Sequence, residues 1–118
     1  MKYSNLICIS AFLFLLASCS SSKKTSDTQA LKIPVPSEEI LSVAKQKFPG
    51  INLEALSEGH KIYTNECTNC HGAKAVKSEP ESEWVSIIDR MAPKANLSEK
   101  QKKQVLEYVL SARAFVSK

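Results

Sequence analysis

Two cysteines three residues apart, followed at once by a histidine, constrain this chain more than any other feature. They form the segment Cys67-Thr68-Asn69-Cys70-His71. Such a pair serves thiol redox chemistry, zinc binding or covalent attachment of haem. A thioredoxin-like dithiol needs a strand–helix–strand setting, and the sequence contains no alternating strand pattern. Structural zinc needs four ligands, yet His60 is the only other histidine. The motif therefore favours haem, with a chance match as the remaining alternative.

The spacing of this motif has a mechanical basis. Two thiols at the end of one helix can reach the two vinyl groups on one edge of a porphyrin, and the adjacent imidazole then lies beneath the iron. We therefore expect one haem c, bound covalently by Cys67 and Cys70, with His71 as the proximal iron ligand. His71 would bind iron through Nε2 and donate its Nδ1–H to a backbone carbonyl, for which a group near Pro80 is a candidate.

The N-terminal residues have the pattern of an export signal. Lys2 supplies a positive start, and the run from Leu6 to Leu16 is almost unbroken apolar sequence. That run is shorter than the roughly 20 residues of a membrane-spanning helix. The segment Leu16-Ala17-Ser18-Cys19 resembles the lipobox of bacterial lipoproteins. The resemblance implies removal of residues 1–18 as a signal peptide and lipidation of Cys19. Ordinary secretory cleavage at the same bond is the alternative.

A lipidated N-terminus implies a cell-membrane anchor on the periplasmic side, in either the inner or the outer membrane. Residues 19–36 are rich in Ser, Thr and Lys without apolar periodicity, so we expect a flexible tether behind the lipid. Cys8 leaves with the signal and Cys19 takes the lipid. Only Cys67 and Cys70 then remain, which excludes the multi-disulfide framework of many small secreted domains.

Residues 37–118 form the predicted domain, and its apolar residues recur with a helical period. The absence of a period-two strand pattern makes the expected fold class all-α. Serines, prolines and glycines at the segment ends supply start and stop signals. The expected helices are 38–48 after an N-cap at Ser37, 53–66, 83–91 after a cap at Ser82, and 99–115 after Ser98.

Met91 is the candidate for the sixth iron ligand, because it is the only methionine left once the signal is removed. One face of the third expected helix holds Trp84, Ile87, Ile88 and Met91. We expect this face to cover the haem and Pro93 to stop the helix behind it. The alternatives are that Met91 is an ordinary core residue, that a lysine binds the iron, that the site is open, or that His60 is the ligand. His60 lies seven residues before Cys67 on the preceding helix and points poorly toward the distal side.

Residues 53–110 resemble a single-haem cytochrome c domain of the helical kind. In that family a glycine and an aromatic residue precede the first cysteine by eight and four positions, and they pack against an aromatic residue of the C-terminal helix. Gly59 and Tyr63 stand at these positions, and Tyr108 with Val105 supplies the partner. Without a Cβ atom at Gly59, two helix backbones can approach closely.

The segment Trp84–Leu97 is similar to bacterial cytochromes c with a short distal side. Met91 follows His71 by only twenty residues, whereas the long mitochondrial type places its methionine much later. The resemblance implies a small cytochrome c fold, in which three helices enclose the haem and the helix over 38–48 is an N-terminal addition.

These observations predict a one-electron carrier. The sequence places no catalytic acid, base or nucleophile near the motif, so we do not expect an enzyme. Two alternatives stay open: a haem-based sensor or small-ligand-binding module, and an electron-donating subunit of a larger exported oxidoreductase. The expected partners are an unidentified redox protein and, through the lipid, a membrane. Residues 37–118 hold twelve basic and eleven acidic side chains without a basic stripe interleaved with aromatics, which argues against nucleic-acid binding.

Overall fold

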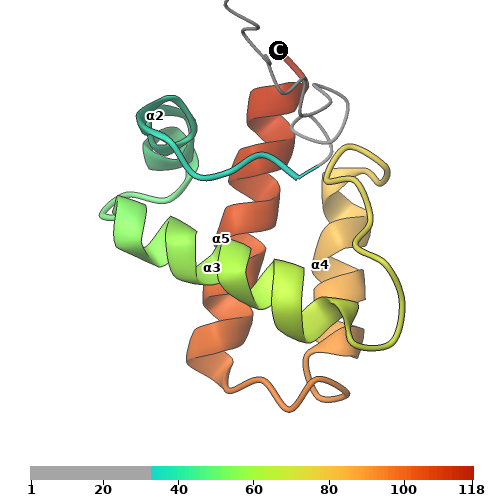
Figure 1. Ribbon diagram of the computed structural model, residues 1–118. Coiled ribbons are helices and arrows are strands. Elements are labelled where there is room, and N and C mark those ends of the chain that lie inside the picture. The colour runs from blue at the N-terminus through green and yellow to red at the C-terminus, as the bar shows by residue number, and fades with distance from the viewer. Residues whose placement is uncertain (1–32) are drawn as a thin grey trace, which may run out of the picture.

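The computed structural model describes residues 33–118, and this part of the chain is entirely helical (Figure 1). The elements are α2 (Glu38–Lys47), α3 (Leu53–Asn65), a short 3-10 helix η1 (Glu66–Thr68), α4 (Glu81–Met91) and α5 (Glu99–Val116). Within the described range there is no strand, so the predicted all-α class is confirmed there. The predicted signal peptide and Cys19 lie outside the described residues. None of the helices in 33–118 has both the length and the hydropathy that crossing a membrane requires.

Short side chains fix the starts of three helices. Ser37 accepts a hydrogen bond from the Ile40 amide at 3.4 Å, as predicted for the start of α2. The Asn52 side chain caps α3 by accepting from the Ala55 amide at 2.8 Å. Ser98 caps α5 in a reciprocal capping box with Gln101. These caps satisfy amides that have no partner inside the helix.

The prediction that Ser82 caps the third helix is wrong. Helix α4 begins at Glu81, its N-cap is Pro80, and no side chain caps it. Pro80 has a φ of −66°, which suits the position before a helix, and Glu81 and Glu83 lie in the first turn. Their negative charges favour the positive end of the helix dipole. Ser82 therefore lies inside the first turn instead of ahead of it.

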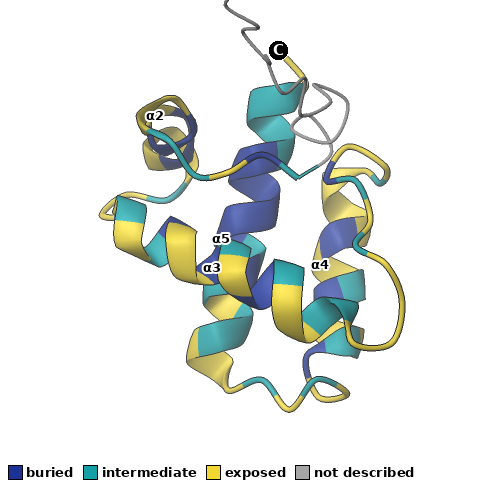
Figure 2. Cartoon of the chain, in the orientation of Figure 1, coloured by how far each residue is buried: buried dark blue, intermediate teal, exposed yellow. Residues whose placement is uncertain are grey.

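Helix α5 is the centre of the fold, with α3 crossing it and α2 and α4 on either side (Figure 1). Figure 2 shows the middle of α5 as the most continuously buried stretch of the domain. A Cβ atom on Gly59 of α3 would lie 2.2 Å from the Gln104 carbonyl oxygen and 2.7 Å from Cβ of Tyr108. The prediction that Gly59 permits a close helix crossing is confirmed. The Tyr63 and Tyr108 rings pack beside this crossing, with their centroids 6.0 Å apart.

The segment ahead of α2 also belongs to the packed domain. Ile33 packs against the core, and Pro34 is buried. The Tyr108 hydroxyl, which is buried in the middle of α5, donates to the Pro34 carbonyl at 2.8 Å. Residues 33–36 were predicted to belong to the tether, and they are the part of it that the structure describes. They pack against the domain, so the packed region includes residues before the predicted boundary at Ser37.

Candidate functional site

A cavity of about 620 Å³ lies between the η1 region on one side and α4 with its following turn on the other. Cys67, Cys70 and His71 line the first wall, and Met91 lines the second. The structure thus brings all four predicted haem-site residues to one cavity, although twenty residues of chain separate His71 from Met91. The volume falls within the roughly 300–1,000 Å³ typical of cofactor and small-molecule sites.

The α4 wall of the cavity is apolar, as the sequence pattern predicts. Trp84, Ile87 and Ile88 line the cavity together with Met91, so the predicted shared face is confirmed. Trp84 and Ile88 are buried, whereas Ile87 and Met91 are half-buried at the cavity surface. A flat apolar ligand in this space would keep water away from that face and gain the corresponding hydrophobic stabilisation.

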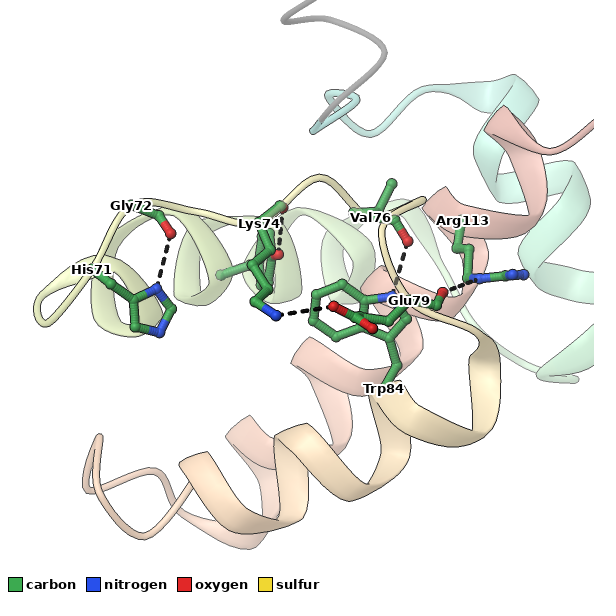
Figure 3. A network of polar contacts seen from close by, with 8 residues as sticks. His71, Gly72, Lys74, Val76, Glu79, Trp84 and Arg113 are labelled. Atoms are coloured by element: carbon green, nitrogen blue, oxygen red, sulfur yellow. Dashed lines mark hydrogen bonds and ion pairs between the residues drawn. The ribbon is translucent and has the colours of Figure 1, made fainter.

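The loop from Asn69 to Pro80 closes one side of the site without a helix of its own, and side chains from three helices hold it (Figure 3). Each of the three donates a hydrogen bond to a backbone carbonyl of the loop. Tyr63 of α3 donates to the carbonyl of Lys74 at 2.6 Å, Trp84 of α4 donates to that of Val76 at 2.9 Å, and Arg113 of α5 donates to that of Glu79 at 2.7 Å. An ion pair between Lys74 and Glu79, at 2.9 Å, joins two points of the loop. These bonds satisfy loop carbonyls that no helix or sheet could satisfy.

Sequence reasoning missed this loop network. The three acceptors are backbone carbonyls, which carry no residue signature. The sequence gives no sign that Arg113 binds the loop, because an arginine near the end of a helix usually lies on a solvated face. The one available signal was Trp84, since a buried indole N–H requires an acceptor.

His71 lies on the exposed loop with its ring on the side that faces α4 (Figure 3). Its Nδ1 is 2.9 Å from the carbonyl oxygen of Gly72. Because a carbonyl only accepts, this hydrogen bond requires a proton on Nδ1. The predicted donation from Nδ1 to a backbone carbonyl is therefore present, but the acceptor is the neighbouring Gly72 and not a group near Pro80.

The two cysteines of the motif are free thiols. Burial of Cys67 raises the pKa of its thiol, and the negative charge of Glu66 raises that pKa further. Redox-active dithiols instead depend on a thiolate with a lowered pKa. The surroundings of Cys67 therefore do not favour thiol–disulfide exchange.

Zinc chemistry is not supported either. Over residues 33–118, no three side chains among His, Cys, Asp and Glu come together to hold a metal ion. Within that range, Cys67, Cys70 and His71 therefore do not form the start of a four-ligand zinc site.

His60, the alternative iron ligand, is not among the residues that line the cavity. Its ring packs edge-on against Tyr108, with centroids 5.2 Å apart, at the crossing of α3 and α5. Partial burial there lowers the pKa of the imidazole. The geometry therefore leaves Met91 as the better-placed of the two residues.

Helix α4 ends at Met91, as predicted, and Pro93 lies just beyond its C-cap at Ala92. A hydrogen-bonded turn follows, in which Ala95 N–H donates to the Met91 carbonyl and Leu97 N–H donates to the Ala92 carbonyl, each at 3.0 Å. Asn96 then ends the coil with a φ of +54°, a left-handed conformation that asparagine tolerates. Pro93 fits inside this extra turn because its fixed φ is helical and only its missing N–H interrupts the ladder.

Comparison of the chain with protein-family models, curated proteins and solved structures gave no match in any of the three. The function has to be inferred from the residues and the geometry of the cavity.

Proposed function

We propose that this protein is a one-electron carrier with a single haem c held covalently in the cavity between η1 and α4. The observation that carries the proposal is that Cys67, Cys70, His71 and Met91, predicted from two separate sequence patterns, all line that one cavity. The proposed fold is a small cytochrome c domain in which α3, α4 and α5 enclose the haem and α2 is an N-terminal addition.

The residues present fit a c-type haem. Two free thiols stand next to an imidazole whose Nδ1 is hydrogen-bonded to a backbone carbonyl, and a thioether lies across the same cavity. The wall between them consists of an indole and two isoleucines. Imidazole with thioether is an axial ligand pair of cytochromes c and raises the reduction potential relative to two nitrogen ligands.

Each group has a defined task in this proposal. Cys67 and Cys70 would hold the porphyrin through thioether bonds, and His71 and Met91 would bind the iron. The hydrogen bond from His71 to Gly72 orients the imidazole and increases its basicity. Trp84 and Ile88, which are buried, would exclude water from the α4 side of the cavity. The bound haem would supply an iron that alternates between ferrous and ferric and so accepts and releases one electron.

The ligand set favours a carrier over a sensor. A sensor or a small-ligand-binding module needs an iron position open to its ligand. Because His71 and Met91 both line the cavity, the protein itself would supply two ligands to the iron, and an external ligand would have to displace one of them. We further propose lipidation at Cys19, so that the domain is tethered to a cell membrane on the periplasmic side and serves a protein redox partner there.

Denaturing electrophoresis of the exported protein tests the covalent haem. The protein band should retain haem peroxidase activity, because thioether bonds survive denaturation. A variant with both Cys67→Ala and Cys70→Ala should lose that activity, whereas His60→Ala should retain it. Extraction of the wild-type haem by acidified organic solvent would refute covalent attachment.

A further inference from the structure

Helix α2 gives the domain an apolar core that lies away from the cavity. Ile40, Leu41 and Ala44 are buried on α2, and they belong to the same hydrophobic core as Leu56 of α3 and Val109 of α5. None of these five residues lines the cavity. Helices α2 and α3 both pack against α5, so the burial of this part of the core requires no ligand. We call α2, α3 and α5 together the platform.

The segment 72–91, which comprises the loop after His71 and helix α4, is here called the cover. The buried residues of α4 are Trp84 and Ile88, and both line the cavity. Val76 of the loop is also buried, and its carbonyl accepts a hydrogen bond from Trp84 of the same segment. Among the helices, α4 packs chiefly against α5, on the side away from α2 (Figure 1). The cover therefore shares less of the core than α2 does.

The ion pairs between the cover and the platform lie near the surface. Lys47 of α2 pairs with Glu81, and Lys102 of α5 pairs with Asp89 at 2.7 Å. In both pairs the carboxylate side chain is about half exposed, at 47% and 54%. Ion pairs of this kind contribute little to stability. Two part-buried hydrogen bonds, from α3 and α5 to carbonyls of the loop, add to them.

The apolar contact between the cover and the platform depends on what fills the cavity. Trp84 packs edge-on against Tyr63 of α3, with centroids 6.0 Å apart, and both rings line the cavity. In a chain without haem, the apolar face of α4 would look across a space of about 620 Å³. Protein interiors are close-packed, and an apolar void costs free energy in proportion to its size. Since the platform is held by its own core, the cover is the part that would move.

We propose that α2 lets this domain fold in two stages, in which the platform is folded before haem is attached and the cover becomes ordered only afterwards. The stability of the platform is independent of the function proposed above, whereas the ordering of the cover by haem rests on it. Cys67 lies in η1, which follows α3 directly and packs against it. The folded platform would therefore present the attachment motif on a formed surface, with the cavity open on the side of the cover.

The first test uses two full-length mature chains without haem, one with Cys67→Ala and Cys70→Ala and one with Cys67→Ser and Cys70→Ser, in a nonionic detergent. Each should show a cooperative thermal transition by circular dichroism. Hydrogen exchange measured by mass spectrometry should be slowed by about tenfold or more in α2, α3 and α5, but by about twofold or less in 72–91. In the wild-type protein with haem, exchange should be slow in both parts.

The second test compares two matched substitutions, Ile40→Ala in α2 and Ile88→Ala in α4. Both isoleucines are buried, with 1% and 5% of their surface exposed. In the haem-free chains, Ile40→Ala should lower the midpoint of unfolding by on the order of 10 °C, whereas Ile88→Ala should change it by about 2 °C or less. In the protein with haem, both substitutions should lower the midpoint, because the cover is then part of the packed structure.

Three results would overturn the inference. Absence of a cooperative transition in both haem-free chains would show that the platform does not fold by itself. Equally slow exchange in the cover and the platform of those chains would show that haem does not order the cover. Equal effects of Ile40→Ala and Ile88→Ala without haem would show that α2 and α4 unfold as one unit. Failure of the proposed function is distinguishable, because the wild-type protein would then lack covalent haem while the haem-free measurements would be unaffected.

Discussion

The indole N–H of Trp84 donates to the carbonyl of Val76 at 2.9 Å, and both residues are buried. Trp84→Phe would leave that carbonyl without a partner in an apolar setting, at a cost of about 1–3 kcal/mol in the free energy of unfolding. Thermal denaturation followed by circular dichroism measures the loss, and hydrogen exchange should show faster exchange in 72–80. Tyr63→Phe, which removes the part-buried bond to Lys74, should cost less. An unchanged midpoint for Trp84→Phe would mean that the loop does not depend on this bond.

Gly59 at the α3–α5 crossing offers a sharp packing test. Gly59→Ala would place a methyl group 2.2 Å from the Gln104 carbonyl oxygen, and backbone atoms cannot move aside without separating the helices. We expect destabilisation at the upper end of about 1–3 kcal/mol. Gly72→Ala is the matched control, because nothing lies within 4 Å of the added methyl group, and it should change stability by about 0.5 kcal/mol or less. Equal effects of the two substitutions would contradict the crossing geometry.

In the proposed carrier, Met91 would decide whether the haem iron has two protein ligands. The resemblance to cytochromes c with His/Met ligation implies a weak far-red absorption band from the methionine sulfur on ferric haem. Met91→Ala should abolish this band, open the iron to carbon monoxide and lower the reduction potential, because water stabilises ferric iron better than a thioether does. Met91→His keeps six-coordination and should lower the potential without opening the site. Wild-type protein that lacks the band and binds carbon monoxide rapidly would favour the sensor function.

His60 gives a pH dependence with a definite sign. Burial lowers the pKa of the folded-state imidazole below its ordinary value of 6.5, so the unfolded chain binds the proton more readily. Stability should therefore be highest above pH 6.5 and decrease as the pH falls from there toward the folded-state pKa. Denaturant titrations at several pH values should show a smaller decrease in His60→Phe, which keeps a ring against Tyr108. The same slope in both proteins would assign the pH effect to other groups.

Cys19 lies outside the described residues, and its role can be tested without structural data. Mass spectrometry of the mature protein should find acyl mass on an N-terminal Cys19. Cys19→Ser should release a soluble protein with the visible spectrum of the wild type, since the core residues of the described part of the chain lie at Ile33 and beyond. A soluble wild-type protein with an unmodified cysteine would support ordinary secretory cleavage instead.

The sequence predicts those parts of the fold and the site that depend on side-chain spacing. The Cys67–His71 motif, the face that ends in Met91 and the small residue at Gly59 are of this kind, and the structure brings the first two to one cavity. Features that depend on backbone acceptors could not be predicted, since a carbonyl such as that of Val76 has no identity in the sequence. Long-range pairing was equally hidden, as with Arg113, which bonds to a loop 34 residues earlier.

The error at the start of α4 came from a local rule with more than one outcome. Serine is a good N-cap, but the sequence Pro80-Glu81-Ser82-Glu83 offers a proline with the right φ two positions earlier. The end of α4 at Met91, ahead of Pro93, was predictable because proline lacks the N–H that would continue the helix. The hydrogen-bonded turn that follows Met91 was not, because its acceptors are backbone carbonyls.

The bond between Tyr108 and Pro34 gives the domain a mechanical property. The Tyr108 hydroxyl that binds Pro34 is buried in the middle of α5. A pulling force applied to the chain before Ile33 would therefore act on α5, through this bond, before it acted on α2. Buried neighbours would have to separate together, so the domain should resist such a force by shear instead of unzipping from its first helix. Tension along the chain would then reach the cavity through the same tyrosine, because Tyr108 packs against Tyr63, which lines the cavity.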